Sequence, residues 1–278
     1  MDIEWALVFF TLLTCLSVGV FAGVAASEWK DGAEAVRKSG AFLALAALVA
    51  GGLASVLHLG HPERIFGAFG HPTSGIFLEA LLMGLFGLGV VLYILALRRK
   101  AAAGVRKAIA TVGMLPAVCL AFAVGYTYVM PSRPAWDTPM LPFLYLASAF
   151  VTGYFAYAVL SAGREGAEGA FIRKVTLNSL ILQAVFIAAF VAHLATVAHP
   201  DASRSAGRVL AGGLAPLFWL GVVIVGTLIP GWLALRAHRD GRPIPLAGAR
   251  LGLLCVLAGG VAFRALMFAV GSAVREFF

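Results

Sequence analysis

Long uninterrupted runs of apolar residues dominate the sequence, and short stretches that hold charges, glycine or proline separate them. Each run approaches the roughly 20 residues that an α-helix needs to cross the hydrocarbon core of a bilayer. The alternation of a transmembrane β-strand is missing, whereas helices satisfy their own backbone in lipid. We therefore predict an all-α bundle of eight transmembrane helices that forms a single integral membrane domain over residues 1–278. The predicted spans are 5–26, 41–59, 76–97, 108–130, 140–162, 175–198, 211–235 and 248–274.

The composition requires a lipid environment. Hydrophobic residues make up 61% of the 278 residues and charged residues only 12%, so a soluble chain of this composition would have too few polar side chains to cover its surface. The chain starts with Asp2 and Glu4 ahead of a long apolar run, and it lacks the basic segment of a cleavable signal peptide. We therefore expect the first helix to remain in the mature protein.

Lys and Arg are distributed unevenly between the connections, which predicts the orientation, since cytoplasmic loops accumulate positive charge. The connections after the first, third, fifth and seventh helices hold Lys30, Arg37, Lys38, Arg98, Arg99, Lys100, Arg106, Lys107, Arg164, Arg173, Lys174, Arg236, Arg239, Arg242 and Arg250. The other three connections hold only Arg64, Arg133, Arg204 and Arg208. An even number of spans then puts both termini outside, which for a multi-pass protein of the bacterial cytoplasmic (inner) membrane is the periplasm.

The net charge of +8 arises from the inner connections. It favours contact with the anionic headgroups of membrane lipid, and we expect no nucleic acid as a partner. No connection is long enough for a soluble domain, and the sequence has no phosphate-binding loop or Cys/His ligand set. Cys15, Cys119 and Cys255 fall in predicted helices without a CxxC pair, which indicates packing residues and no metal site. Any chemistry is therefore expected within the helix bundle.

Four polar side chains fall at or near membrane depth, where a charge is costly and persists with a partner or a task. Glu79 and His58 lie at the outer ends of the third and second predicted helices. His193 lies about one turn below the outer end of the sixth, and Arg264 lies about 15 Å from the outer end of the eighth by helical rise. All four lean toward the periplasmic leaflet, which predicts a polar cavity at that interface.

Two interpretations of these residues stay open from spacing alone. A histidine beside a carboxylate can bind and release protons near neutral pH, which suits oxidation of a quinol that loses two protons with its electrons. In the structural interpretation, His58 caps its helix, Glu79 occupies an N-terminal turn that favours carboxylates, and Arg264 pairs with a carboxylate.

Several short motifs resemble, in their order along the chain, the membrane anchor subunit of the bacterial dimethyl sulfoxide reductase family. They are Ser55-Val56-Leu57-His58-Leu59-Gly60-His61-Pro62 followed by Ala68-Phe69 and Glu79; Val8-Phe9-Phe10-Thr11; Pro134-Ala135-Trp136-Asp137-Thr138-Pro139; and Arg264 to Phe268. Eight spans with outside termini also agree with that family.

The resemblance implies a quinone-reactive anchor that contains no haem. It implies a complex with a molybdopterin catalytic subunit and a subunit that carries four iron–sulfur clusters, so these groups belong to partners. The anchor would exchange electrons between menaquinone or another quinone and the iron–sulfur subunit in anaerobic or sulfur-compound respiration. It would be a subunit of an oxidoreductase, and the terminal substrate would react elsewhere. We expect the iron–sulfur subunit to dock on the outer face, around residues 61–75, 131–139 and 200–208.

The resemblance also implies roles for single residues. His58 corresponds to a family histidine implicated at the quinol site, Glu79 to the carboxylate that begins the third helix, and Arg264 to the arginine of the last helix. This chain has Gly259-Gly260 where the family often has an acidic residue, which leaves the counter-charge of Arg264 open. We predict His58 and Glu79 as the proton-handling residues. The predicted quinone-binding residues are His58, His61, Glu79, Trp136, His193 and Arg264.

Two other functional classes compete with this prediction. In a haem-binding cytochrome b-type subunit, His58 and His193 would supply axial ligands from different helices, although the sequence lacks a repeated pair of facing histidines. Pro216 and Pro230 interrupt the seventh span, as in the broken helices of a secondary transporter, although no inverted internal repeat is present.

Overall fold

The computed structural model describes residues 3–58, 67, 70, 73–163, 169–197 and 200–271, apart from the side chains of His58, Pro200 and Asp201. Within these residues the protein is all-α. The helices are α1 (Trp5–Trp29), α2 (Glu34–His58), α3 (Gly75–Arg98), α4 (Ala103–Tyr126), α5 (Met140–Ser161), α6 (Gly169–Thr196), α7 (Pro200–Leu210), η2 (Leu217–Leu228), α8 (Ile229–Asp240) and α9 (Leu246–Val270). η2 is a π-helix that continues directly into α8.

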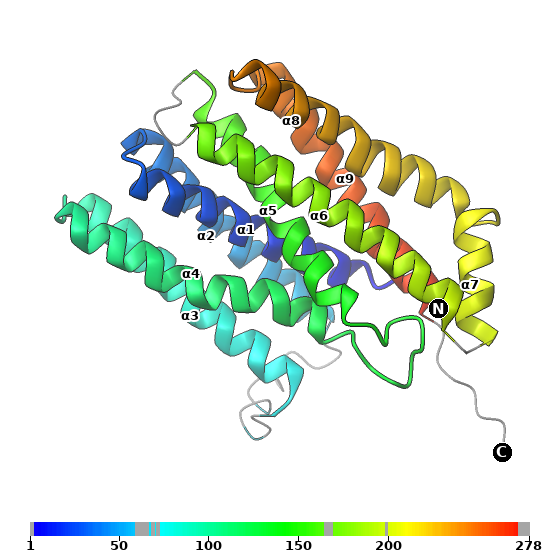
Figure 1. Cartoon of the computed structure of the whole chain (residues 1–278). Helices are drawn as coiled ribbons and strands as arrows, with labels where there is room; N and C mark the ends of the chain where they lie inside the picture. The colour runs from blue at the N-terminus through cyan, green and yellow to red at the C-terminus, as the bar shows by residue number, and fades with distance from the viewer. Residues whose placement is uncertain are drawn as a thin grey trace.

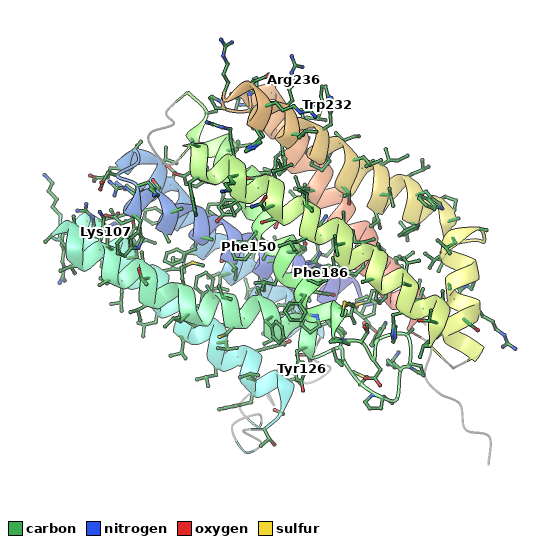
Figure 2. The ribbon with its side chains drawn as sticks, in the orientation of Figure 1. Lys107, Tyr126, Phe150, Phe186, Trp232 and Arg236 are labelled. Carbon is green, nitrogen blue, oxygen red and sulfur yellow. The ribbon has the colours of Figure 1, made fainter. Side chains whose placement is uncertain are left out.

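Eight helical segments in the described part of the chain are long and apolar enough to cross a membrane, which confirms the predicted number. Successive spans run in opposite directions (Figure 1), so α1 begins and α9 ends on one side of the bundle, called here the terminal face. The opposite side, where α1, α3, α5 and α8 end, is called the basic face. Lys107 and Arg236 lie at the basic face and Tyr126 at the other end, with Phe150 and Phe186 between (Figure 2).

α1 and α5 form the centre of the bundle. α1 packs against α2, α4 and α5, and α5 packs against α4, α6 and α9. Figure 1 shows α3 and α4 on one flank of this pair and α8 and α9 on the other. Gly19 and Gly153 lie where α1 meets α5, and a Cβ added to either would overlap the backbone of the other helix. The same holds between Gly226 of η2 and Gly259 of α9, so glycine sets how closely these helices approach.

Several predicted helix ends are wrong. α2 begins at Glu34 where residue 41 was predicted, and α6 begins at Gly169 where residue 175 was predicted. α4 is shifted toward the N-terminus of its predicted span 108–130, and α9 ends at Val270, short of residue 274. An apolar run marks only the part of a helix that lies in hydrocarbon, whereas backbone hydrogen bonding continues through the polar headgroup layer.

The seventh span also differs from its prediction. It covers Leu217–Asp240, whereas 211–235 was predicted, and the residues before it form α7 in a segment that was predicted to be a loop. Ala202, Ala206 and Val209 recur at helical spacing in α7 and are buried. A short amphipathic helix with this pattern has too little total apolarity to stand out in a hydropathy profile.

Candidate functional site

A cavity opens near the terminal face between α1, α2 and α3, and it is called here the Glu79 pocket. Its volume is about 470 Å³, which lies within the range of small-molecule sites in proteins. Most of the lining is apolar, and the polar groups come from Ser55, Glu79, Thr127 and Tyr128. Among the described residues, those that line the pocket are Leu7, Phe10, Gly52, Ser55, Val56, Ile76, Glu79, Ala80, Met83, Thr127 and Tyr128.

Glu79 lies in the second turn of α3. The helix begins after Ser74, whose hydroxyl accepts a hydrogen bond from the Phe77 amide at 3.2 Å and so caps the N-terminus. The Glu79 side chain is part-buried, and within the described side chains no Lys, Arg or His approaches it to salt-bridge distance. The carboxyl therefore lies in an apolar pocket without a cationic partner in the described structure, close to where a ligand would bind.

Thr127 gives the Glu79 carboxyl a partner in either protonation state. The Thr127 hydroxyl lies 2.7 Å from Glu79 Oε1 and 2.9 Å from the Ala123 carbonyl oxygen. A hydroxyl has one proton to donate and can also accept. When Glu79 is ionised, Thr127 donates to it; when Glu79 is protonated, Glu79 donates to Thr127, which donates to Ala123. The geometry thus accommodates uptake of a proton by Glu79 with only a rotation of one hydroxyl.

Tyr128 is the second polar wall of the pocket, and the sequence analysis missed it. Its ring stacks on Tyr145 at a centroid distance of 6.0 Å and meets Trp136 and Phe268 edge-on. Burial, reinforced by the neighbouring Tyr145 and Glu79, raises the pKa of Tyr128 well above its usual value, so the phenol remains a neutral donor. The signal available in the sequence was a tyrosine at the end of a span, next to the Trp136 motif.

Trp136 packs against the side of Tyr128 that faces away from the pocket. Its side chain is buried, its indole N–H donates to the Met267 carbonyl oxygen at 2.8 Å, and the guanidinium of Arg133 lies over its ring. Trp136 does not line the Glu79 pocket, and it contacts the Tyr128 ring that does. Its position therefore suits orienting Tyr128, and direct contact with a quinone stays a prediction.

Arg264 is buried in α9, and it lies closer to the C-terminal end of its helix than predicted. Since α9 ends at Val270, the residue lies about 9 Å from the helix end by rise. Its Nε donates to Thr11 Oγ1 at 2.7 Å, its Nη1 donates to the Gly260 carbonyl at 3.1 Å, and its guanidinium lies over the Tyr145 ring. Among the described residues no carboxylate lies within 4 Å, so the expected acidic partner is replaced by hydroxyl, carbonyl and aromatic groups.

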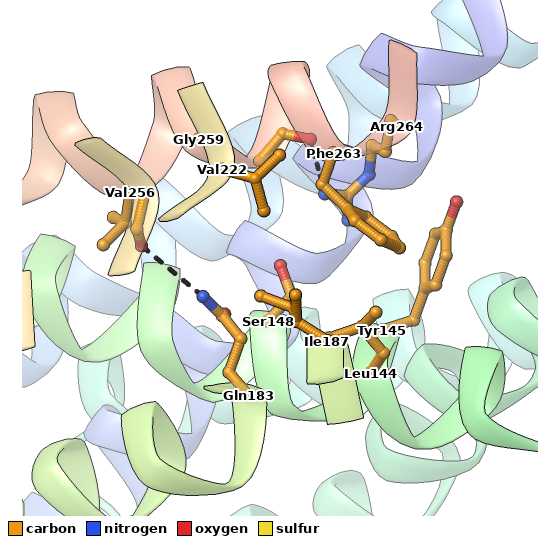
Figure 3. Close-up of a pocket in the computed structure, with 12 residues that line it drawn as sticks. Leu144, Tyr145, Ser148, Gln183, Ile187, Val222, Val256, Gly259, Phe263 and Arg264 are labelled. Carbon is orange, nitrogen blue, oxygen red and sulfur yellow. Dashed lines mark hydrogen bonds between the residues drawn. The ribbon is translucent and has the colours of Figure 1, made fainter. Parts of the chain in front are cut away.

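A small cavity beside Arg264 is enclosed by α5, α6, η2 and α9 (Figure 3). Its volume is about 20 Å³, comparable to the space one water molecule needs, so it is too small for a quinone ring. The Gln183 side-chain amide on its wall donates to the Gly226 carbonyl at 3.5 Å. The stacked Tyr145 and Tyr128 rings separate Arg264 from the Glu79 pocket, so Arg264 adds positive charge behind the pocket without lining it.

The predicted histidines are not all placed together. His193 Nε2 lies 3.0 Å from the Pro134 carbonyl oxygen, and the residue does not line the Glu79 pocket. α2 ends at His58, one turn beyond the pocket residue Ser55, and the His58 side chain lies outside the described structure. His61 also lies outside the described residues. The structure thus places Glu79 in the pocket and leaves the histidine roles as predictions.

A second carboxylate of interest, which the sequence analysis missed, lies at the basic face. Glu28 Oε2 accepts hydrogen bonds from Arg37 Nη1 and the Tyr93 hydroxyl, both at 2.6 Å, and Oε1 accepts from Arg106 Nε at 3.0 Å. Glu28 is fully buried. It joins α1, α2, α3 and α4, and it had been assigned to a loop because the first predicted span ended at residue 26.

The sequence matches the protein family described as "Polysulphide reductase, NrfD" over residues 2–269. Two curated relatives are each 25% identical to it. One is the C subunit of the polysulfide reductase of Wolinella succinogenes, aligned over 290 residues that cover 94% of this chain and 91% of the relative. The other is the C subunit of the anaerobic dimethyl sulfoxide reductase of Escherichia coli strain K12, aligned over 284 residues that cover 98% of each.

The bd oxidase from Geobacillus thermodenitrificans has a similar structure, with a TM-score of 0.61 over 96% of this chain and 86% of that chain. The two sequences are 13% identical. At this identity the similarity concerns the fold alone.

Proposed function

Because the protein belongs to the polysulphide reductase NrfD family, we propose that it is the quinone-reactive membrane anchor of a molybdopterin–iron–sulfur oxidoreductase. The resemblance to the dimethyl sulfoxide reductase anchor is confirmed by the family match and by relatives that are each the C subunit of a reductase. The proposed partners are a catalytic subunit with molybdopterin and a subunit with four iron–sulfur clusters, and the proposed location is the bacterial cytoplasmic membrane.

The observation that carries the proposal is the Glu79 pocket. A quinone ring needs an apolar cavity of this scale with a few polar groups to orient it. The pocket supplies the Glu79 carboxyl, and its lining includes the exposed residues Ile76 and Ala80 of α3. Glu79, Thr127 and Tyr128 come from two segments 48 residues apart, and the fold brings them to one wall. Trp136 and Arg264 support this wall from behind.

The proposed chemistry is proton-coupled oxidation of a quinol. The quinol releases two electrons to the iron–sulfur subunit and two protons to bases at the pocket. In this proposal Glu79 accepts one of the protons, and Thr127 turns its hydroxyl toward Ala123 to receive the new O–H of Glu79. His58 is the proposed second base, following its match to the family motif. The reverse sequence of the same steps reduces a quinone.

Filling the pocket tests the assignment. Ala80 lines the Glu79 pocket, and its neighbour Leu81 is exposed on the same helix and does not line it. In membranes that contain the assembled complex, Ala80→Phe should raise the KM for quinol at least tenfold and leave turnover with an artificial soluble donor unchanged, because a bulky ring occupies the ligand volume. Leu81→Phe should leave both unchanged. A normal KM in Ala80→Phe would place the quinone elsewhere.

The terminal face is proposed to be periplasmic. The support is the accumulation of Lys and Arg on the basic face, which resists translocation. Alkaline phosphatase fused after Phe278 should be active and green fluorescent protein there dark, and fusions near Lys100 should behave in the reverse way. The opposite pattern of activity would put the partner subunits in the cytoplasm.

The terminal face is also the proposed docking surface for the iron–sulfur subunit. A partner on the basic face would be separated from the Glu79 pocket by much of the roughly 30 Å hydrocarbon core. Of the three predicted docking segments, 61–75 lies largely outside the described residues. The segment 131–139 exposes Ser132 and Asp137, and 200–208 is part of α7, which exposes Arg204.

Photo-crosslinking tests this surface. Trp136 is buried, so the crosslinkers are placed at the exposed Ser132 and Asp137 of the same segment. Both should capture the iron–sulfur subunit in the assembled complex, and a crosslinker at Lys100 should not. Capture from Lys100 alone would contradict docking at the terminal face.

A further inference from the structure

A long apolar groove runs along the outer surface of the bundle between α3 and α4, and it is called here the α3–α4 groove. Its volume is about 600 Å³, larger than that of the Glu79 pocket, and its surface is almost wholly apolar. Gly89 and Gly113 lie at the seam, where the helices approach most closely, and exposed side chains such as Leu88 and Val112 form its walls. Among the lining residues there is no carboxylate, histidine or tyrosine to exchange protons with a quinone, so the groove does not duplicate the proposed quinone pocket.

The length of the groove matches one leaflet of a bilayer. Its lining extends along α3 from Leu82 to Leu92 and along α4 from Ala108 to Cys119. Ten residues of helix rise about 15 Å, which is half of the roughly 30 Å hydrocarbon core. The groove crosses the middle of α3, since Leu82 lies seven residues after Gly75 and Leu92 lies six residues before Arg98. Its length is one that a single acyl chain entering from the basic face can fill.

The end of the groove at the basic face carries uncompensated positive charge. The hairpin from Ala80 to Trp136 has no Asp or Glu, and it holds Arg98, Arg99, Lys100, Arg106, Lys107 and Arg133. Acids from α1 and the turn after it neutralise two of the residues at the basic end: Glu28 binds Arg106, and Asp31 lies 3.3 Å from Lys107.

Three cations remain at this end of the groove. Arg98 is exposed and lies over the Phe42 ring, and Arg99 and Lys100 are exposed in the turn after α3. Within the described residues no carboxylate pairs with any of the three. Arg98 lies about 9 Å beyond Leu92 by helical rise, which is the distance at which the headgroup of a lipid in the groove would lie.

We propose that the α3–α4 groove and the basic turn after it form a binding site for one anionic phospholipid, with an acyl chain in the groove and the phosphodiester at Arg98, Arg99 and Lys100. Basic clusters between transmembrane helices bind anionic headgroups in this way. The charge selects the anionic lipid, and the groove adds apolar contact that the turn alone lacks. The groove shares no lining residue with the Glu79 pocket, and the site does not depend on the quinone chemistry.

Titration of the purified complex, washed free of lipid, tests the proposal by native mass spectrometry. Phosphatidylglycerol and phosphatidylethanolamine with identical acyl chains are the probes. The wild type should retain one phosphatidylglycerol at concentrations that leave phosphatidylethanolamine unbound. Arg99→Gln with Lys100→Gln should weaken phosphatidylglycerol binding roughly thirtyfold, given the contribution of each cation near an anionic headgroup. Millimolar inorganic phosphate should not displace the lipid, because it lacks the acyl tail.

Matched variants separate the site from general surface charge. Arg239→Gln with Arg250→Gln removes two exposed cations near the same face, away from the groove, and should change binding less than twofold. Cys119→Trp narrows the end of the groove that is farther from the basic face, and it should weaken phosphatidylglycerol binding although the basic turn is intact. The proposal would be overturned if Arg239→Gln with Arg250→Gln weakened phosphatidylglycerol binding as much as Arg99→Gln with Lys100→Gln. Equal affinity of the wild type for both lipids would also overturn it.

A photo-crosslinker at Val112 identifies the occupant in the intact membrane. The exposed Val112 side chain lies on the groove wall, so the expected product is this subunit with the added mass of one phospholipid. A crosslink to a second copy of the protein or to another subunit would show that a protein helix fills the groove, which would also overturn the proposal.

Discussion

Quinol-linked turnover of the assembled complex is expected to fall by a factor of about 10² to 10⁴ when Glu79 is replaced by glutamine, which is the usual contribution of a general base. Glutamine keeps the size of the side chain and can still accept the hydrogen bond from Thr127 Oγ1. It cannot take up a proton from the quinol. Turnover with an artificial soluble donor bypasses the pocket and should stay at the wild-type level.

The comparison between the two donors makes this result specific to the pocket. Thr127→Ser keeps the hydroxyl and should retain activity, whereas Thr127→Val removes the group that shares the proton with Glu79 and should lower quinol turnover less than Glu79→Gln does. His58→Ala should resemble Glu79→Gln if the histidine is the second base. Equal loss with both donors would indicate failed assembly, and normal quinol turnover in Glu79→Gln would remove Glu79 from the proton path.

The largest expected effect on stability comes from Glu28→Leu at the basic face. This change leaves the guanidinium groups of Arg37 and Arg106 without the carboxylate that accepts from both, and Arg37 is itself buried. Removing one partner from a buried ion pair costs about 3–5 kcal/mol. We expect a markedly lower midpoint of thermal unfolding and a reduced yield of folded complex, measured by fluorescence-detected size exclusion after heating in detergent.

Two further variants check the physical reason for this loss. Asp31→Asn removes an exposed ion pair with Lys107 at the same face, and such pairs contribute about 0–1 kcal/mol, so its midpoint should remain near that of the wild type. Adding Arg37→Met to Glu28→Leu removes one buried cation that has lost its carboxylate partner, and it should restore part of the stability. If Glu28→Leu and Asp31→Asn have the same midpoint of thermal unfolding, the buried network does not hold the four helices together.

The sequence by itself determined the membrane architecture. Each residue contributes to membrane insertion through its own transfer free energy, so a run of about 20 apolar residues is sufficient to predict a span. The eight spans were therefore predictable. The unequal distribution of Lys and Arg between the two sets of connections predicted an orientation, because each connection is also judged from its own residues. Helix ends were less predictable, as Glu34 and Gly169 show, because a helix continues beyond the hydrocarbon where hydropathy carries no signal.

Sequence motifs also indicated Glu79 and Arg264 as candidate site residues, but they did not indicate which residues each one contacts. Glu79 bonds to Thr127, 48 positions away, and Arg264 bonds to Thr11, 253 positions away. Glu28 gave no signal because it lay just outside a predicted span, although Arg37, Arg106 and Tyr93 all bind it.

Only the tertiary structure decided these pairings. The rotation of each helix about its axis and the depth at which it crosses its neighbour depend on contacts such as Gly19 against Gly153, where the absence of side chains lets α1 and α5 touch. Such packing depends on the shapes of two distant segments together, whereas hydropathy depends on one segment at a time. The sequence therefore determined which segments enter the membrane, and the packing of those segments decided which polar residues share a pocket.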